Sequence, residues 1–373
     1  MRPRRPSRAS VLVIVLVTLL FATLALVAFI EKAGTDLLVD AREATGRRLR
    51  QEAYSALEVT VAVLEDFRQA NGSLRSPAEG WNEPFKFAGW TPRDGCTAEV
   101  SFEDESGKLS LPHADAATLV NLFKAWEMPE SDAERLADAL MSWMKKDYVP
   151  TSSLATDYDR GELPYAAPLR PLRSYDELAA IDYARDVFYD EHGRPNDYHR
   201  RFVAAFSLYD YSSTNLNSGL SDVLSAVGSF GDAQKQPLID YLTGSGSYAR
   251  QGPGYLQSTD DASRLLGSKI PGGFGTEISA LRVNIVIREG RTEFHLTAVL
   301  APSGGATTVQ TKATTTAVTT SDKTGTAEAA TSGSTATTST DAAADKKLNY
   351  PFTLLEIREN AEISAPPTEQ PQA

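Results

Sequence analysis

Residues 10–30 read SVLVIVLVTLLFATLALVAFI, an apolar run without a charged residue. As an α-helix rising about 1.5 Å per residue, the run is long enough to cross a bilayer core of roughly 30 Å. Arginines at positions 2, 4, 5 and 8 precede it, and the charge pair Glu31-Lys32 ends it. Because basic flanks stay in the cytoplasm, we expect everything after Ile30 to be exported.

A cleaved signal peptide is the first alternative for this run. Its apolar region spans about 7–15 residues and ends at small residues on the far side of the membrane. Here the far side reads Phe29-Ile30-Glu31-Lys32, which offers no such residue. We therefore expect the span to be retained. A plain membrane anchor is the second alternative, and the next segment of the chain argues against it.

No proline occurs between Pro6 and Pro77, so nothing interrupts a helix from Ser10 to about Gln69. Beyond the membrane, apolar residues recur at mostly three- and four-residue intervals on a charged background. They are Leu37, Leu38, Ala41, Leu49, Ala53, Leu57, Val61, Leu64 and Phe67. This pattern predicts a rod whose first half packs in a membrane or a helix bundle and whose second half covers a globular domain.

Composition excludes several functional classes. The chain has 373 residues and a formal net charge of −12, which argues against a body that binds nucleic acid. The single Cys96 excludes an intrachain disulfide and a cysteine-rich zinc site. No Gly-x-Ser-x-Gly or His-Glu-x-x-His motif occurs. We therefore expect no enzyme, and a membrane-anchored hydrolase is a minor alternative.

The exported part alternates between strand and helix patterns. Residues 96–102 and 108–111 alternate on either side of a Gly-containing turn, which predicts a β-hairpin. Apolar helical faces follow from His113 to about Tyr241, with capping boxes predicted at Ser131-x-x-Glu134 and Ser174-x-x-Glu177. Alternation returns from residue 283 to 300 and from 350 to about 358. Strands on both sides of a helical block predict an α+β fold, in which a large all-helical insertion interrupts an antiparallel sheet.

In this order of elements the chain resembles the type II secretion system minor pseudopilins of the K family. The most specific internal match is Pro171-Leu172-Arg173-Ser174-Tyr175-Asp176-Glu177-Leu178, and Asn215-Leu216-Asn217 is similar to a second family element. The resemblance implies a long N-terminal transmembrane helix packed on a pilin-like sheet. It also implies a prepilin peptidase cut between Ala9 and Ser10. The fifth mature residue is then Ile14, where ordinary pilins carry glutamate and a tip subunit needs none.

The implied role is that of a minor pseudopilin that caps the tip of the periplasmic pseudopilus and helps to initiate it. The implied partners are the I- and J-type minor pseudopilins, the major pseudopilin, the prepilin peptidase and the inner-membrane secretion platform. The implied location is the bacterial inner membrane, with one span, a cytoplasmic N-terminus and a periplasmic body. The alternative is a minor pilin of a type IV pilus or DNA-uptake system with a helix-hairpin-helix-like insert at Asn215-Leu216-Asn217. That insert would need a Gly-x-Gly hairpin and basic neighbours, which the sequence does not offer.

These patterns divide the chain into consecutive parts. We predict a basic leader at 1–9, a transmembrane helix at 10–30, its amphipathic continuation at 31–71, the first part of the sheet at 72–112, a helical insert at 113–272, terminal strands at 273–301 and 347–360, a disordered Thr/Ala/Ser-rich loop at 302–346 and a loose tail at 361–373.

Calcium is the one metal that the sequence suggests. Asp157, Asp159 and Glu162 surround Gly161 as oxygen ligands of calcium loops do, and the family resemblance implies calcium near a Gly-x-Glu element. The alternative is a solvated acidic loop. His192 and His199 lie seven residues apart, but Gly193 and Pro195 break the helix that would align them, so we expect surface histidines.

Overall fold

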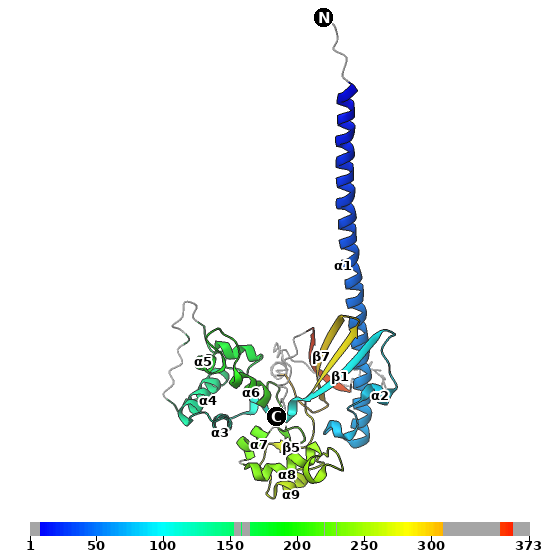
Figure 1. Ribbon diagram of the computed structural model, residues 1–373. Coiled ribbons are helices and arrows are strands. Elements are labelled where there is room, and N and C mark those ends of the chain that lie inside the picture. The colour runs from blue at the N-terminus through cyan, green and yellow to red at the C-terminus, as the bar shows by residue number, and fades with distance from the viewer. Residues whose placement is uncertain are drawn as a thin grey trace, which may run out of the picture.

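The computed structural model describes residues 8–152, 158, 165–219, 221–228, 230–308 and 351–360. Within these residues the chain forms a long helical rod, a sheet that packs against the rod, and a helical domain on the other side of the sheet (Figure 1). The expected α+β class with a long N-terminal helix packed on an antiparallel sheet is confirmed.

Helix α1 spans Arg8–Asn71, without a break at Gly34 or Gly46. Its packing on the sheet begins at Leu49, which is 1% exposed. The prediction that the second half of the rod covers a globular domain is confirmed from Leu49 onward, whereas Leu37 and Leu38 are 69% and 62% exposed. The rod projects beyond the sheet, as Figure 1 shows, so this first part of the predicted stripe has no sheet to cover.

The sheet has four antiparallel strands in the order β1-β6-β7-β8. Strand β1 spans Cys96–Asp104, β6 spans Leu281–Glu289, β7 spans Thr292–Pro302 and β8 spans Phe352–Glu359. Alternate residues of β6 and β7 point to α1 and are buried, as the alternation predicted. The core between helix and sheet consists of Leu49, Ala53, Ala56, Leu57, Val61, Leu64, Val283, Ile285, Ile287, Phe294, Leu296, Ala298 and Leu300, together with further members from the connecting segments.

The connection from α1 to β1 closes one end of this core. It contains the 3₁₀ helix η1 (Pro77–Glu79) and the short helix α2 (Pro84–Ala88). Trp81 is fully buried, and its ring meets the ring of Phe102 edge-on at 5.0 Å between centroids. An aromatic pair of this geometry adds to the free energy of folding beyond its buried area.

The predicted hairpin between residues 96–102 and 108–111 does not form. Strand β1 pairs with β6, and β2 (Leu109–Ser110) instead pairs in parallel with β3 (Phe206–Ser207). The 3₁₀ helix η2 (Glu105–Gly107) turns the chain away between them. Leu109 and Leu111 are both buried in the helical domain, and that burial outweighs the local alternation.

The insertion of a helical block into the sheet is confirmed by the strand order, because β1 and β6 are neighbours although the whole helical domain separates them in sequence. The helices are α3 (Ala116–Ala125), α4 (Glu130–Met144), α5 (Ala184–Phe188), α6 (Asp197–Ala205), α7 (Ser221–Gly228), α8 (Asp232–Thr243) and α9 (Thr259–Leu266), with 3₁₀ turns η3 (Leu111–His113), η4 (Tyr175–Ala180) and η5 (Gly246–Tyr248). Strand β4 (Thr214–Asn215) pairs in parallel with β5 (Phe274–Gly275).

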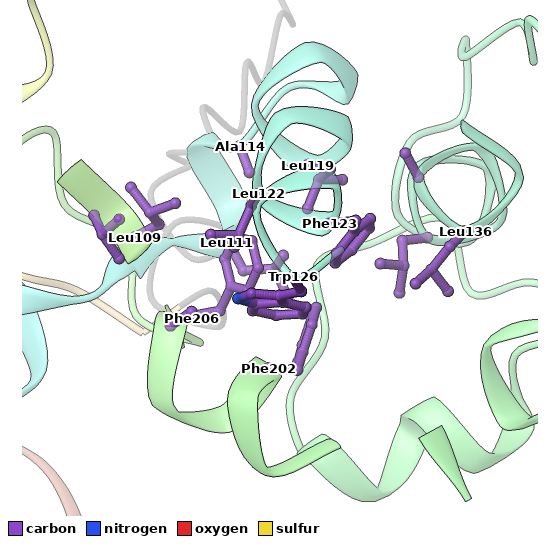
Figure 2. Packing of buried hydrophobic residues seen from close by; sticks show 14 of the residues in the cluster. Leu109, Leu111, Ala114, Leu119, Leu122, Phe123, Trp126, Leu136, Phe202 and Phe206 are labelled. Carbon is purple, nitrogen blue, oxygen red and sulfur yellow. The ribbon is translucent and has the colours of Figure 1, made fainter. Parts of the chain in front are cut away.

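One apolar core holds these helices together. Figure 2 shows Trp126, directly after α3, beside Phe202 and Phe206, and Phe123 directed toward α4. The rings of Phe202 and Phe206 lie 4.7 Å apart. Large side chains packed at this density bury enough apolar area for the helical domain to have a core of its own.

The two capping boxes have different outcomes. Helix α4 begins at Glu130 after Pro129, with no side-chain cap, so the box predicted at Ser131 is wrong. The helix thus begins two residues earlier than the capping pattern suggested, directly after Pro129. At the second site Ser174 does cap, accepting from the Asp176 amide at 3.1 Å, and Glu177 accepts from the Arg173 amide at 2.9 Å. The capped element is the 3₁₀ helix η4, however, and not an α-helix.

Candidate functional site

The apolar segment of α1 is the first part of the candidate site. Among the described residues, α1 is a helix long and apolar enough to cross a membrane, with a mean hydropathy of 3.0 over its most apolar 18 residues. Ile14 lies in this segment and is 61% exposed. Ala9 and Ser10 belong to the first turn of α1, which begins at Arg8. Cleavage between them stays a prediction.

The part of the rod between Ile30 and Leu49 carries an exposed apolar stripe. At about 100° per residue, Ala33, Leu37, Ala41 and Ala44 lie on one side, with Gly34 and Leu38 beside them. An adjoining side of the helix is charged and carries Lys32, Asp36, Asp40, Glu43 and Arg47. The stripe precedes Leu49, where the packing of the rod on the sheet begins. The chain's own sheet therefore does not cover this stripe.

A collar of polar contacts fixes the rod where it meets the sheet. Arg50 and Tyr54 both bind the carboxylate of Glu359 at the end of β8, at 2.7 Å each. On the other flank Glu52 accepts from the Arg93 amide at 3.0 Å. The pKa of Glu359 is lowered because Arg50 and Tyr54 donate hydrogen bonds to its carboxylate. Contacts on both flanks hold the rod against rotation about its own axis.

The predicted calcium ligands Asp157, Asp159 and Glu162 lie outside the described residues. Asp138 on α4 is buried and accepts hydrogen bonds from the Tyr148 hydroxyl and the Ser152 amide. In the part of the chain that the structure describes, no group of three or more His, Cys, Asp or Glu side chains is suited to a metal. Calcium stays a prediction.

His192 and His199 lie in different environments. His192 is exposed. His199 is half-buried, and its ring packs against Tyr189 at 5.2 Å between centroids. Burial lowers the pKa of His199, so the neutral ring is the form that packs there. The expectation of surface histidines holds for His192, whereas His199 is part of the packing of the helical domain.

The Asn215-Leu216-Asn217 element faces inward. The amide nitrogen of Asn215 donates to the carbonyl of Arg75 at 2.9 Å and to the carboxylate of Asp104 at 2.7 Å. Asn217 donates to the carbonyls of Leu256 and Thr276 and accepts from the Leu256 amide. Both side chains thus bind the chain itself, whereas a helix-hairpin-helix element would present its polar groups to a phosphate backbone.

Next to these asparagines lies a buried charged cluster that sequence reasoning missed. Glu105 is 1% exposed, and its carboxylate accepts from Arg282 at 2.7 Å and pairs with Lys108 at 3.4 Å. Burial raises the pKa of Glu105, but Lys108 and Arg282 outweigh burial and the net effect lowers it. The sequence Glu103-Asp104-Glu105-Ser106 is typical of a solvated turn, so no local signal marks the third residue as buried.

Comparison with known proteins gives a family match for part of the chain. Residues 103–191 match the family model described as type II secretion system (T2SS), protein K. A chain of the crystal structure of the GspK–GspI–GspJ complex from the enterotoxigenic Escherichia coli type 2 secretion system is similar with 13% identity and a TM-score of 0.47, over 70% of this chain and 94% of that chain. At this score the likeness does not by itself establish a shared fold. No curated protein matches the chain.

The matched residues begin at the end of β1, include Glu105 and Lys108 of the buried charged cluster, and run through α3, α4 and α5. They therefore include the connection from the sheet to the helical domain, and they do not include the rod α1. On this match, the segment from the end of β1 to just beyond α5 is similar to protein K of the type II secretion system.

Proposed function

We propose that the protein is a minor pseudopilin that caps the tip of the periplasmic pseudopilus of a type II secretion system and helps to initiate its assembly. The observation that carries the proposal is the family match over residues 103–191. The apolar rod α1 supports it. The role is structural and not enzymatic.

The proposed location is the bacterial inner membrane. The span of α1 up to Ile30 holds the protein there, the arginine-rich N-terminus lies in the cytoplasm, and the sheet and helical domain lie in the periplasm. From Ile30 to Leu49 the helix covers roughly 28 Å, so the globular part stands clear of the lipid headgroups.

Ile14 supports a tip position. A carboxylate at this place would be costly in hydrocarbon, by a few kcal/mol, unless a subunit ahead of it neutralised the charge. A tip subunit has no subunit ahead. An isoleucine that is exposed on the helix surface packs in the bilayer without needing such a partner.

The exposed stripe around Leu37 and Ala41 is the surface on which we propose that partner helices pack. The partners are the I- and J-type minor pseudopilins and then the major pseudopilin, assembled on the inner-membrane secretion platform. The solved complex described above combines GspK with GspI and GspJ. Small residues in the stripe let a second helix approach closely. We propose no nucleic acid partner.

The first test is the mature N-terminus of membrane-extracted protein, measured by mass spectrometry with and without prepilin peptidase. We expect a peptidase-dependent start at Ser10 with the apolar helix retained. An uncut Met1, or a cut beyond Ile30, would refute the pseudopilin assignment.

A second test uses Ile14→Glu, with Ile14→Leu as the conservative control and Leu19→Glu as a charge placed elsewhere on the same helix. At equal protein levels we expect Ile14→Glu to lower secretion at least tenfold and Ile14→Leu to leave it unchanged. If Ile14→Glu supports normal secretion, the apolar residue is not required. If Leu19→Glu gives the same loss as Ile14→Glu, the effect belongs to charge in the span and not to this position.

We also propose, from the sequence pattern alone, that calcium binds to Asp157, Asp159 and Glu162. Calcium titration by calorimetry, with Asp159→Asn as the variant and EDTA-treated protein as the starting state, tests this. Binding in the parent and a loss of at least tenfold in affinity in the variant are expected. Equal affinity of the two proteins would refute the assignment of these ligands.

A further inference from the structure

The globular part contains two separate apolar cores. One lies between α1 and the sheet, and the other lies among the helices α3–α9. The segment 206–217, here called the strap, runs between these two cores. The strap begins at β3, which pairs with β2, and it ends just after β4, which pairs with β5. Each end of the strap is therefore held by main-chain hydrogen bonds.

Three side chains of the strap reach from the helical domain to the sheet. The Tyr209 hydroxyl donates to the carboxylate of Glu356 on β8. The Tyr211 hydroxyl contacts two carbonyl oxygens, of Glu105 at 2.7 Å and Lys108 at 2.8 Å. The strap thus contacts β8 at one edge of the sheet and, at the other edge, the segment that directly follows β1.

Asn215 makes the third connection. It is fully buried, and its amide group binds the Arg75 carbonyl from the α1–β1 connection and the Asp104 carboxylate at the end of β1. Its oxygen accepts from the Asn217 amide at 3.1 Å. Every hydrogen-bonding group of this side chain has a partner, which is the condition under which a buried polar network specifies one geometry.

The backbone of the strap adds a further link. Asp210 and Thr307 exchange two main-chain hydrogen bonds, at 2.9 and 3.0 Å, which join the strap to the segment after β7. Asn217 then connects the end of the strap to Leu256 and Thr276, on the α8–α9 side of the helical domain.

The apolar contact at this junction is small. It comprises Tyr209, Tyr211, Ala280, Val299, Ala301 and Ala306, of which four are alanine or valine. Two domains joined by a small contact move relative to each other unless directional bonds prevent it. Here the buried hydroxyls and the amide of the strap supply such bonds.

We propose that the strap locks the helical domain in one orientation relative to the rod α1, and that Tyr209, Tyr211 and Asn215 are the positioning residues of this lock. The helical domain then moves with the rod as one body. Removing the three polar groups turns the junction into a hinge and leaves both apolar cores folded. This inference concerns orientation alone and stands or falls independently of the proposed function.

The test measures a distance distribution between two spin labels by pulsed electron paramagnetic resonance on the full chain in detergent. Cys96→Ser removes the native thiol. One label is placed at exposed Glu58 on α1 and the other at exposed Ala233 on α8, each through a cysteine substitution. The strap variant combines Tyr209→Phe, Tyr211→Phe and Asn215→Ala. We expect the width of its distribution to be at least twice that of the parent.

A matched control removes the same groups at places that do not join the two cores. Tyr165 and Tyr241 each donate to a carbonyl within the helical domain, and Asn284 binds Thr297 within the sheet. The control variant Tyr165→Phe/Tyr241→Phe/Asn284→Ala is expected to keep the parental width. A label pair inside the helical domain, at Glu134 and Ala233, should keep its distribution in both variants.

The proposal is overturned if the strap variant keeps the parental width, or if the control broadens as much. Should the triple variant not fold, Tyr211→Phe alone decides the matter by amide hydrogen exchange at Asp210 and Thr307. We expect exchange at least tenfold faster than in the parent, with Tyr165→Phe unchanged. Equal exchange in Tyr211→Phe and the parent would overturn the proposal as well.

Discussion

Substituting the buried carboxylate of Glu105 by an amide, Glu105→Gln, tests the charged cluster between sheet and helical domain. The change keeps the volume of the side chain and removes its charge. Arg282, at 2.7 Å in the parent, and Lys108, at 3.4 Å, then face a neutral amide. Glu103 stays near both cations, at 2.6 Å from Lys108 and 3.7 Å from Arg282, and compensates part of the loss.

The expected loss of unfolding free energy is about 3 kcal/mol, at the lower end of the range for breaking a buried pair, because Glu103 remains as a partner. The loss has a defined pH dependence. Because the pKa of Glu105 is lowered in the folded protein, its stabilising effect is present above the unfolded pKa, about 4.3, and disappears as pH falls through the folded value. The difference between parent and variant should therefore shrink on acidification below pH 4.

Urea unfolding in detergent micelles, followed by tryptophan fluorescence and circular dichroism, measures this loss. With a urea slope of about 3 kcal/mol per molar, the midpoint should fall by about 1 M. The control is Glu99→Gln, which breaks an Arg–Glu pair of the same sheet at 2.7 Å from Arg288, but on the exposed surface. The control should not shift the midpoint measurably, because solvent screens exposed pairs.

Two results would refute the reasoning. One is a fall of the urea midpoint in Glu105→Gln no larger than that in Glu99→Gln, which would mean that burial does not increase the stabilisation by the ion pair. The other is a loss that does not change with pH, which would mean that packing and not charge causes it.

Three further predictions follow from burial and exposure. Burial raises the pKa of Asp104 to about 6, so ionisation opposes folding, and the unfolding free energy should fall by about 2 kcal/mol as pH rises from 4 to 6; urea midpoints across this range should show the fall in the parent and not in Asp104→Asn, and a flat parent would contradict it. Trp81→Ala should lower the unfolding free energy by about 3–5 kcal/mol in the same assay. Phe87→Ala should lower it by less than about 1 kcal/mol, because Phe87 is 56% exposed; equal losses would refute the assignment of Trp81 to the core. Leu37→Ser with Leu38→Ser should leave the urea midpoint unchanged and weaken co-purification of I- and J-type pseudopilins at least tenfold, and unchanged co-purification would exclude the stripe as the docking face.

Much of the fold follows from periodicity in the sequence. The apolar run of residues 10–30 and the absence of proline up to Pro77 predict α1, and the alternation from 283 to 300 predicts β6 and β7. These signals are local: each residue's preference is set by neighbours within one or two turns of helix or one strand. The position of strands before and after a helical block was enough to predict the insertion.

The hairpin error shows where local signals end. Residues 108–111 alternate as a return strand would, yet β2 pairs with β3, about 100 residues away. The pairing with β3 and the burial in the helical core compete with the predicted hairpin. Both involve residues distant in sequence, so the local pattern does not indicate them. The same holds for α4, whose start is set by Pro129 and not by the capping pattern at Ser131.

The sequence by itself determined the rod, its long apolar segment, the class of fold and the family resemblance, because hydrophobic periodicity and length are properties of consecutive residues. Only the tertiary structure decided that Glu105 is buried, that Asn215 and Asn217 bind the chain itself, and that the sheet leaves the stripe around Leu37 uncovered. These features depend on contacts between segments far apart in sequence and on where along its length the helix meets the sheet. A polar residue has the same local pattern whether water or a buried partner satisfies it, and only the fold distinguishes the two.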